Sequence, residues 1–305
     1  MSRSATNPKD RGAAPWILLA PFLALFALFT AYPLLSSVSL SLSQSFGPAH
    51  TRFVGLDNFA HMARDPLFWT SLSNTTLYTL GSIALQLPIA LALALLLERP
   101  GLRGRHTWRL VLFSPSLVGI PFAAIIFALA FEKNTGLVNQ LLHHATPAVG
   151  LAPFDLEFDW LTTRALWTFI LASLWMYVGL NMVYFQAALQ NVPRELLEAA
   201  RVDGAGPLQR FLHVTLPAIR PVAGYVVLLS VIGSFQVFEL PYLILTVAGK
   251  ASDRASTLVM YLYTHGFDTG DLGFASAVGW ALSLVLIAAA ALQRVVARRD
   301  SEASA

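Results

Sequence analysis

The residues best suited to chemistry are polar and aromatic side chains placed inside otherwise apolar stretches. Two such groups stand out, and their members are Ser234, Phe235, Gln236, Phe238 and Glu239 in one stretch and Tyr177 and Asn181 in another. Hydroxyl, amide and carboxyl groups beside aromatic rings form hydrogen bonds and stacking contacts with a polar solute. Within a membrane such groups usually face the protein interior or a water-filled path. Both groups are therefore predicted to bind a solute rather than to catalyse a reaction.

Each of these residues also has a simpler interpretation. An aromatic ring can serve helix packing alone, and the amides of Asn181 and Gln236 need buried partners whether or not they bind a solute. Glu239 lies about 30 Å along its apolar segment when counted from Ala218, close to the far end. Its carboxylate is therefore expected either in the path or hydrated at the membrane surface.

Several classes of site are excluded by the residues present. Cysteine is absent, which excludes disulfides, thiolate metal sites and thiol catalysis. The seven histidines lack zinc-site spacing, and the pair His143-His144 is expected to face solvent. Gly249-Lys250 is preceded by Ile244 where a nucleotide-binding phosphate loop needs its first glycine. No serine elbow or metallopeptidase helix is found, and the basic residues do not form the stripe that is typical of nucleic-acid binding.

The composition is that of a membrane protein. Charged residues make up 12% of the chain and apolar residues 56%, and the mean hydropathy is +0.61. Since a membrane-spanning helix needs roughly 20 apolar residues, six spans are predicted: Trp16–Leu40, Phe68–Leu97, Leu110–Phe131, Ala165–Leu189, Ala218–Leu245 and Leu272–Gln293. The uncharged stretch Gly12–Ala49 is too long for a cleavable signal peptide, so it is expected to stay in the membrane. The fold class is thus all-α and polytopic.

Positive charges predict the orientation of these spans. Fourteen Lys and Arg residues fall on the side of both termini, and six fall on the other side. Because cytoplasmic loops carry the excess of positive charge, both termini are predicted to be cytoplasmic. The sequence is divided into a tail at 1–15, a transmembrane domain at 16–296 and a tail at 297–305. The external connections are 50–67, 132–164 and 247–271, and the second of them begins with a predicted short helix, Gly136–Leu142, that forms either a solvated cap or a docking surface for an external protein.

A polar, charged insert at 191–217 separates two of the apolar stretches. Pro193 and Glu195 suit the first turn of a helix that is predicted to run to about Val202. Asp203 and Gly204 then break it, since glycine adopts positive φ readily at a helix end. A second helix is predicted to begin at Pro207 and to end at Pro217. The polar insert is therefore predicted to be two short helices joined by a sharp bend, with His213 either in contact with a partner or packed inside the insert.

The polar insert resembles the EAA loop of binding-protein-dependent ABC importer permeases. The matching residues are Glu198, Ala199, Ala200, Gly204, Val214, Thr215, Leu216 and Pro217, and Val192-Pro193, Glu195-Leu196 and Asp203-Gly204-Ala205 are typical of the carbohydrate-uptake branch, the maltose and glycerol-3-phosphate type. Further matches are Phe53-Val54-Gly55-Leu56-Asp57-Asn58-Phe59, Gly136-Leu137-Val138-Asn139 and Phe235-Gln236-Val237-Phe238. The chain departs from the family pattern at Ala248-Gly249-Lys250, where that branch usually has Gly-Gly-Pro. The resemblance therefore does not predict the conformation of the external turn at these residues.

The resemblance implies a type I ABC importer permease fold and a set of partners. These are a second homologous permease, an ATPase dimer, an extracytoplasmic solute-binding protein and the lipid of a bacterial or archaeal cytoplasmic membrane. The chain itself is expected to bind no cofactor, since ATP and Mg belong to the partner ATPase. By the same resemblance, Glu198, Ala199, Ala200, Asp203, Gly204, Leu216 and Pro217 couple the chain to that ATPase, while Tyr177–Asn181 and the Ser234–Glu239 group lie where related permeases contact sugar.

Other functions remain as alternatives to a sugar permease. The solute of the importer is not necessarily a sugar, and a glycerol phosphodiester fits the same motifs. An ion-coupled secondary transporter normally needs carboxylates near the midplane, and Glu239 lies too near one end for that role. A membrane enzyme or a scaffold is the third class, and no set of catalytic residues in the sequence supports it.

Overall fold

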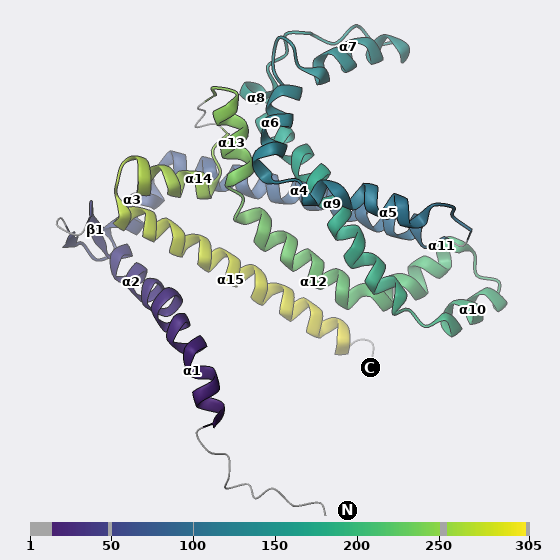
Figure 1. The fold of residues 1–305 in the computed structure, drawn as a ribbon, viewed down its shortest axis with the longest axis horizontal. Coiled ribbons are helices and arrows are strands. Elements are labelled where there is room, and N and C mark those ends of the chain that lie inside the picture. Colours follow the sequence, from purple (N-terminus) through teal and green to yellow (C-terminus); the bar gives the residue numbers. More distant parts are fainter. Residues whose placement is uncertain (1–13, 48–50, 100, 251–254, 303–305) are drawn as a thin grey trace, which may run out of the picture. The chain divides into compact units, whose positions relative to one another are not determined.

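The computed structural model describes residues 14–47, 51–99, 101–250 and 255–302. The predicted tail at 1–15 lies almost wholly outside them, as do residues 303–305. The described chain forms two compact units, which Figure 1 shows as ribbons. Unit 1 contains residues 1–64 and 262–281, and unit 2 contains residues 65–261 and 282–305. Within the described residues the structure is helical apart from one small β-hairpin.

Unit 1 is built around the N-terminal helices and that hairpin. Its elements are α1 (Ala14–Phe26), a π-helical turn (Ala27–Ala31), α2 (Tyr32–Ser41), β1 (Ser43–Ser45), β2 (Thr51–Phe53), α3 (Asp57–Arg64), a second π-helical turn (Thr264–Asp268) and the start of α15 (Leu272–Glu302). β1 and β2 pair antiparallel, with Gln44 opposite Arg52. The buried Asn58 amide donates to the carbonyls of Ser41 at 3.0 Å and Ser43 at 2.9 Å, so it fixes α3 to the end of α2.

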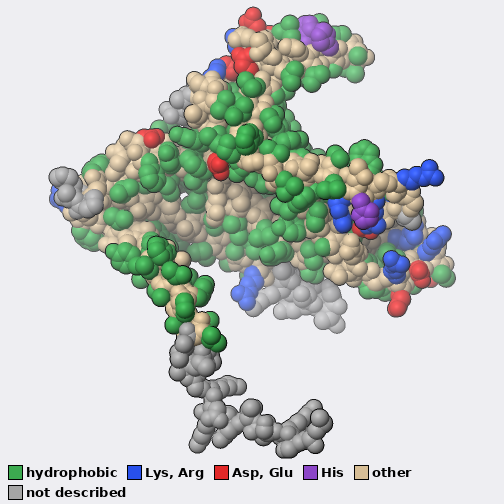
Figure 2. Space-filling model, in the orientation of Figure 1, with side chains coloured by type: hydrophobic (Ala, Val, Ile, Leu, Met, Phe, Trp, Pro, Cys, Tyr) green, Lys and Arg blue, Asp and Glu red, His purple; other side chains and the backbone are tan. Residues whose placement is uncertain are grey.

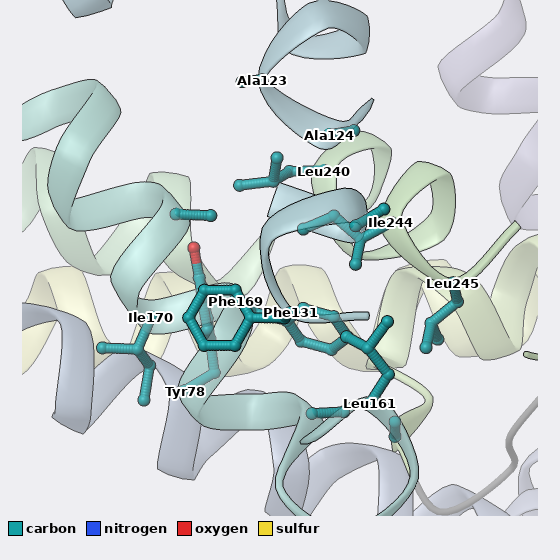
Figure 3. Close-up of a cluster of buried hydrophobic side chains, with 14 of the residues drawn as sticks. Tyr78, Ala123, Ala124, Phe131, Leu161, Phe169, Ile170, Leu240, Ile244 and Leu245 are labelled. Atoms are coloured by element: carbon teal, nitrogen blue, oxygen red, sulfur yellow. The ribbon is translucent and has the colours of Figure 1, made fainter. Parts of the chain in front are cut away.

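Unit 2 contains the remaining helices. They are α4 (Pro66–Leu97), α5 (Arg105–Phe113), α6 (Ile120–Ala130), α7 (Leu137–Ala148), α8 (Trp160–Thr163), α9 (Ala165–Gln190), α10 (Arg194–Val202), α11 (Pro207–Arg210), α12 (Leu216–Phe235), α13 (Glu239–Val247), α14 (Leu258–Tyr263) and the rest of α15. Helix α4 packs along α9, and α6 packs along α13. Small and aromatic side chains from these four helices form the main core, in which Tyr78, Phe169, Ile170 and Leu240 lie together (Figure 3).

The close contact of α5 with α9 depends on one glycine. A β-carbon on Gly179 would lie 1.9 Å from the carbonyl oxygen of Leu112, a distance that atoms cannot adopt. Two turns further along α9, Gln186 accepts a hydrogen bond of 2.7 Å from Nε of Arg109. Because 179 and 186 lie on the same face of a helix, these two contacts hold α5 along the half of α9 that leads to the polar insert.

Five of the six predicted spans correspond to long apolar helices, and the number six is reached only if a bent pair of helices counts as one span. Five stretches of helix in the described residues are long and apolar enough to cross a membrane: Leu18–Ser41, Pro66–Leu97, Ala165–Gln190, Pro207–Phe235 and Leu272–Val295. The predicted span Leu110–Phe131 is instead a bent pair, Arg105–Leu117 and Ile120–Ala130, whose axes differ by 93°. Gly119 and Pro121 lie at the bend, where proline lacks a backbone N–H to continue the helix.

The predicted single helix over Ala218–Leu245 is wrong as well. Helix α12 ends at Phe235 and α13 begins at Glu239, so the chain is non-helical at 236–238. The carbonyl of Val237, released by this break, accepts a hydrogen bond of 3.0 Å from the Thr257 hydroxyl. An unpaired carbonyl away from water is costly, and the Thr257 side chain removes that cost.

Candidate functional site

A cavity of about 480 Å³ lies in unit 2 beside the break between α12 and α13. We call it the polar cavity. Helix α4 contributes Tyr78, Ser82 and Gln86, α9 contributes Ser173, Tyr177, Leu180, Asn181 and Tyr184, and the region from α12 to α13 contributes Leu229, Ser230, Gly233, Ser234, Gln236, Val237, Phe238, Glu239 and Leu240, with Ile120 from α6. Hydroxyls, amides and aromatic rings therefore surround this space.

Six of the seven predicted path residues line the polar cavity. They are Tyr177, Asn181, Ser234, Gln236, Phe238 and Glu239. Phe235, the last residue of α12, is not among the residues that line it. The break has the further effect of placing Glu239 in the first turn of α13, at the cavity wall rather than at the far end of a straight span.

The sequence analysis missed the whole contribution of α4 to this lining, and also Ser173 of α9 and Ser230 of α12. Ser82 and Gln86 are buried, and they contact α9 through Ser173: the hydroxyls of Ser82 and Ser173 lie 3.5 Å apart, and the Gln86 amide donates to the Ser173 carbonyl at 3.3 Å. Polar residues recur along α4 at 71, 75, 79, 82 and 86, a helical spacing inside a long apolar segment. That spacing is a sequence signal for one inward-facing polar stripe.

Other polar and aromatic residues of α9 serve packing. Trp175 lies against Phe127, with ring centroids 5.9 Å apart, and Gln186 is fully buried in its contact with Arg109. Tyr184 is the further aromatic residue of α9 that reaches the cavity.

The polar insert (191–217) has the bend that the sequence predicts. Helix α10 spans Arg194–Val202, and Gly204 has a φ of +80°. The amide of Ala205 donates to the Ala200 carbonyl at 2.9 Å, and the amide of Gly204 donates to the Arg201 carbonyl at 3.2 Å. These two bonds form a Schellman ending, which requires a left-handed residue and therefore favours glycine.

The second half of the polar insert differs from the prediction. The helix that begins at Pro207 does not end at Pro217 but continues through α11, a π-helical turn (Phe211–Thr215) and α12. Pro217 lies in the first turn of α12, directly after the π-helical turn. Proline has no backbone N–H, and the wider hydrogen-bonding pattern of a π-helical turn lets the helix continue past it. His213 is exposed and contacts the Gln209 carbonyl at 3.0 Å through its ring.

One face of the polar insert is anchored and the other is open. Val192 and Ile219 are buried with Ala188 in a small apolar cluster against which Leu197 packs. The predicted coupling residues Glu198, Ala199, Asp203, Gly204, Leu216 and Pro217 are exposed, and Ala200 is half-buried. Exposed apolar side chains accompany them, among them Val202 at 87% and Leu208 at 69% of their full accessible area. Figure 2 shows charged side chains gathered over this end of unit 2.

The connection 132–164, which the sequence predicts to be external, is held by side-chain hydrogen bonds. Asn139 is fully buried, donates to the Leu156 and Phe158 carbonyls at 2.9 and 3.0 Å, and accepts from the indole of Trp160 at 2.7 Å. Gly136 has no room for a β-carbon, which would lie 2.2 Å from the Glu132 carbonyl. Helix α7 starts where the sequence predicts but runs six residues further, to Ala148. His143 does not face solvent as predicted, because its ring contacts the Phe154 carbonyl at 2.7 Å and is half-buried; His144 is exposed.

An ion pair ties this connection to the turn after α13. Lys250 Nζ lies 2.5 Å from an Asp159 carboxylate oxygen and 3.1 Å from the Thr162 hydroxyl. Partial burial alone would raise the pKa of Asp159, but hydrogen bonds from Lys250 and Thr162 outweigh it and hold that pKa below its usual range. The departure Ala248-Gly249-Lys250 thus forms an ordered turn, in which Gly249 has a φ of +63°. Among the described residues no group of three or more His, Asp or Glu side chains is arranged to hold a metal ion.

Comparison with known proteins identifies the family. The chain is 36% identical over 281 residues to the arabinooligosaccharides transport system permease protein AraP of Bacillus subtilis, covering 91% of this chain and 86% of AraP. It is 31% identical over 287 residues to the lactose transport system permease protein LacF of Rhizobium radiobacter, with 93% of each chain covered. A crystal structure of a bacterial ABC transporter that imports the acidic polysaccharide alginate contains a chain of the same fold, with a TM-score of 0.78, 21% identity and 95% of this chain covered.

The fold is therefore that of a type I ABC importer permease, as the sequence predicts. Residues 86–301 match the family model described as "Binding-protein-dependent transport system inner membrane component". That family is a transport component, so the chain is a transport subunit and not an enzyme. The match includes α9, the polar insert and both halves of the broken helix, which carry the proposed site. The chain belongs to the inner-membrane components of binding-protein-dependent ABC transport systems.

Proposed function

We propose that this chain is one permease subunit of an ATP-driven importer for a sugar or a related polyhydroxylated solute. The observation that carries the proposal is the polar cavity, with its hydroxyls, amides and aromatic rings at the helix break. Amides and hydroxyls exchange hydrogen bonds with sugar hydroxyls, and aromatic faces pack on the apolar faces of sugar rings. The similarity to permeases named for arabinooligosaccharides and lactose supports the same solute class.

The polar cavity is proposed as this subunit's half of the translocation path. Tyr177, Asn181, Ser234, Gln236, Phe238 and Glu239 are the candidate contacts, with Tyr78, Ser82 and Gln86 added by the structure. A second, homologous permease supplies the other half, and an extracytoplasmic binding protein delivers the solute.

The polar insert is proposed as the contact with the ATPase dimer. Its exposed apolar residues and the small side chains Ala199 and Ala200 form a surface that another protein can approach closely. Helix α10 follows α9 directly, and α9 lines the polar cavity. A movement of the polar insert with the ATPase is therefore transmitted through α9 to the cavity wall, while ATP and Mg are bound by the ATPase alone.

This function places the chain in the cytoplasmic membrane of a bacterium or archaeon. The proposed domain is 16–296, with cytoplasmic tails at 1–15 and 297–305 and with the polar insert also in the cytoplasm. The excess of Lys and Arg on that side supports this orientation.

Two substitutions test the proposal by separating its two parts. Gln236→Leu removes a cavity amide and is expected to lower solute uptake into proteoliposomes at least tenfold, while the ATPase still co-purifies. Glu198→Lys reverses a charge on the polar insert and is expected to weaken ATPase co-purification. Gln140→Leu, on the exposed external helix α7, is the matched control for the first substitution. Normal uptake by Gln236→Leu, or normal assembly of Glu198→Lys, would contradict the corresponding assignment.

A further inference from the structure

The charge of the polar cavity comes from a single side chain. Eighteen residues line the cavity, and none of them is Lys, Arg or His. Glu239 is the one acidic residue among the eighteen, and it is exposed within this chain. The other polar groups are neutral hydroxyls and amides.

The two helix ends at the break do not compensate for this carboxylate. Helix α12 ends at Phe235 and α13, nine residues long, begins at Glu239. A helix end carries roughly half an elementary charge, negative at a C-terminus and positive at an N-terminus. The ends of α12 and α13 therefore roughly cancel where they meet, and the full negative charge of Glu239 remains.

Glu239 also lies in the first turn of α13, where a helix leaves backbone N–H groups free of intrahelical partners. A helix N-terminus on its own attracts an anionic solute. Here the C-terminus of α12 offsets that attraction, so the carboxylate of Glu239 decides the sign of the potential in the cavity.

We propose that Glu239 makes the polar cavity selective by charge, so that neutral and cationic solutes are admitted and anionic solutes are disfavoured. The inference rests on the proposed function, since it takes the cavity to be the solute path. It narrows the solute class to uncharged saccharides and polyols or to amino-substituted ones. Phosphorylated, sulfonated and uronic-acid solutes would meet a like charge with no cationic side chain in this half of the path.

Thiol labelling in the assembled importer measures this potential directly. The chain has no cysteine, so Ser234→Cys gives it one thiol, in the cavity wall. The probes are a trimethylammonium-bearing and a sulfonate-bearing ethyl methanethiosulfonate, which are similar in size and opposite in charge. In each case the thiolate attacks the thiosulfonate sulfur, a mixed disulfide forms and methanesulfinate leaves. Mass spectrometry of this chain gives the two rates, and each is divided by the rate of the same reagent with a free thiol in solution.

The ratio of the cationic rate to the anionic rate is the quantity to compare. A change in the pKa of the cysteine alters both rates equally, so it cancels in the ratio. We expect a ratio of about tenfold, equivalent to roughly 1.4 kcal/mol, that falls close to one in Glu239→Gln and is retained in Glu239→Asp. Glu157→Gln, which removes an exposed carboxylate outside the cavity, is the matched control and should keep the ratio.

The outcomes separate this inference from the proposed function. Labelling with no preference for the cation, or with a preference that Glu239→Gln leaves unchanged, would overturn charge selection while leaving the path in place. A second permease that neutralises Glu239 would produce the first of these results. Labelling by neither reagent would show that water does not reach Ser234, which would overturn the path and the inference together.

Discussion

Gly204 is the residue on which the bend of the polar insert depends. A β-carbon at this position meets no other atom within 4 Å, so the cost of adding one comes from the φ of +80°. A left-handed backbone costs a residue with a β-carbon roughly 1–2 kcal/mol. That strain is too small to unfold the protein but large enough to displace the bend, which is otherwise held by two backbone hydrogen bonds, from Gly204 to Arg201 and from Ala205 to Ala200.

Gly204→Val is therefore expected to leave membrane insertion and the cavity intact and to reduce ATPase co-purification several-fold. The matched control is Gly249→Val, because Gly249 has a φ of +63°, has no atom near its absent β-carbon and lies outside the polar insert. Both variants carry similar backbone strain, and we expect only the first to lose the ATPase. Equal loss in the two variants would mean that the effect is general destabilisation.

The ion pair of Lys250 with Asp159 permits a prediction about pH. The pKa of Asp159 is lowered in the folded protein, so the pair contributes stability above the usual pKa of the carboxyl, near 3.8, and loses it as the pH falls through the lowered value. Because Lys250 is 37% exposed, the contribution at neutral pH should be at most about 1 kcal/mol.

Thermal unfolding of Lys250→Met and of the unchanged protein should thus differ by a few degrees or less at pH 7 and converge as the pH falls through the lowered pKa of Asp159. Lys133→Met is the control, because Lys133 lies 3.9 Å from Glu157 in a more exposed pair and should change the unfolding temperature less. A difference that grows on acidification would show that Lys250 acts by some route other than Asp159.

At the scale of elements, the sequence predicts where helices lie better than where they break. Apolar length is a property of every residue in a span, so five spans are found as long helices and the sixth as a bent pair. The break at 236–238 depends instead on Thr257, which satisfies the Val237 carbonyl from 20 residues away. No local sequence pattern indicates that contact. The bend before α6 did have local signals, Gly119 and Pro121, which were outweighed by the apolar run around them.

In the polar insert too, the sequence predicts some features correctly and misses one that depends on several residues together. Its first helix and its bend follow from Pro193, Glu195 and Gly204, and the structure confirms them. Its second helix was expected to stop at Pro217 because the residue before a proline avoids the α-helical region. The π-helical turn before Pro217 changes the bonding pattern and lets the helix continue, which is a cooperative property of several residues rather than of proline itself.

The broken helix leads to a prediction about Thr257. Thr257→Val keeps the shape of the side chain and leaves the Val237 carbonyl without this donor, which should cost roughly 1–3 kcal/mol. The break borders the polar cavity, so we expect a lower unfolding temperature and weaker solute uptake. Thr246→Val is the control, since the Thr246 hydroxyl only returns to the Tyr242 carbonyl of its own helix. An unchanged unfolding temperature for Thr257→Val would show that water satisfies the Val237 carbonyl instead.

At the scale of the whole molecule, the family and the fold follow from motifs that the structure explains physically. Asn58 and Asn139 are the two clearest cases, because each is a buried amide that joins separate segments through backbone carbonyls. Six of the seven residues predicted for the solute path line the polar cavity, and the sequence indicates them because polar groups are rare in apolar spans. The contribution of α4 was missed because serine and threonine are common enough in membrane helices to escape notice singly.

The orientation of the chain in the membrane is the property on which all proposed roles depend, and it can be tested with two thiols. Fourteen of the twenty Lys and Arg residues lie on the side assigned to the cytoplasm. Glu157→Cys lies in the connection before α8 and His106→Cys lies in α5, and both positions are exposed in a chain without other cysteines. A membrane-impermeant maleimide added to intact cells should label the first and spare the second until the membrane is opened. Because the spans alternate, labelling of His106→Cys from outside would also place α10 outside, where no ATPase could reach Glu198 or Gly204.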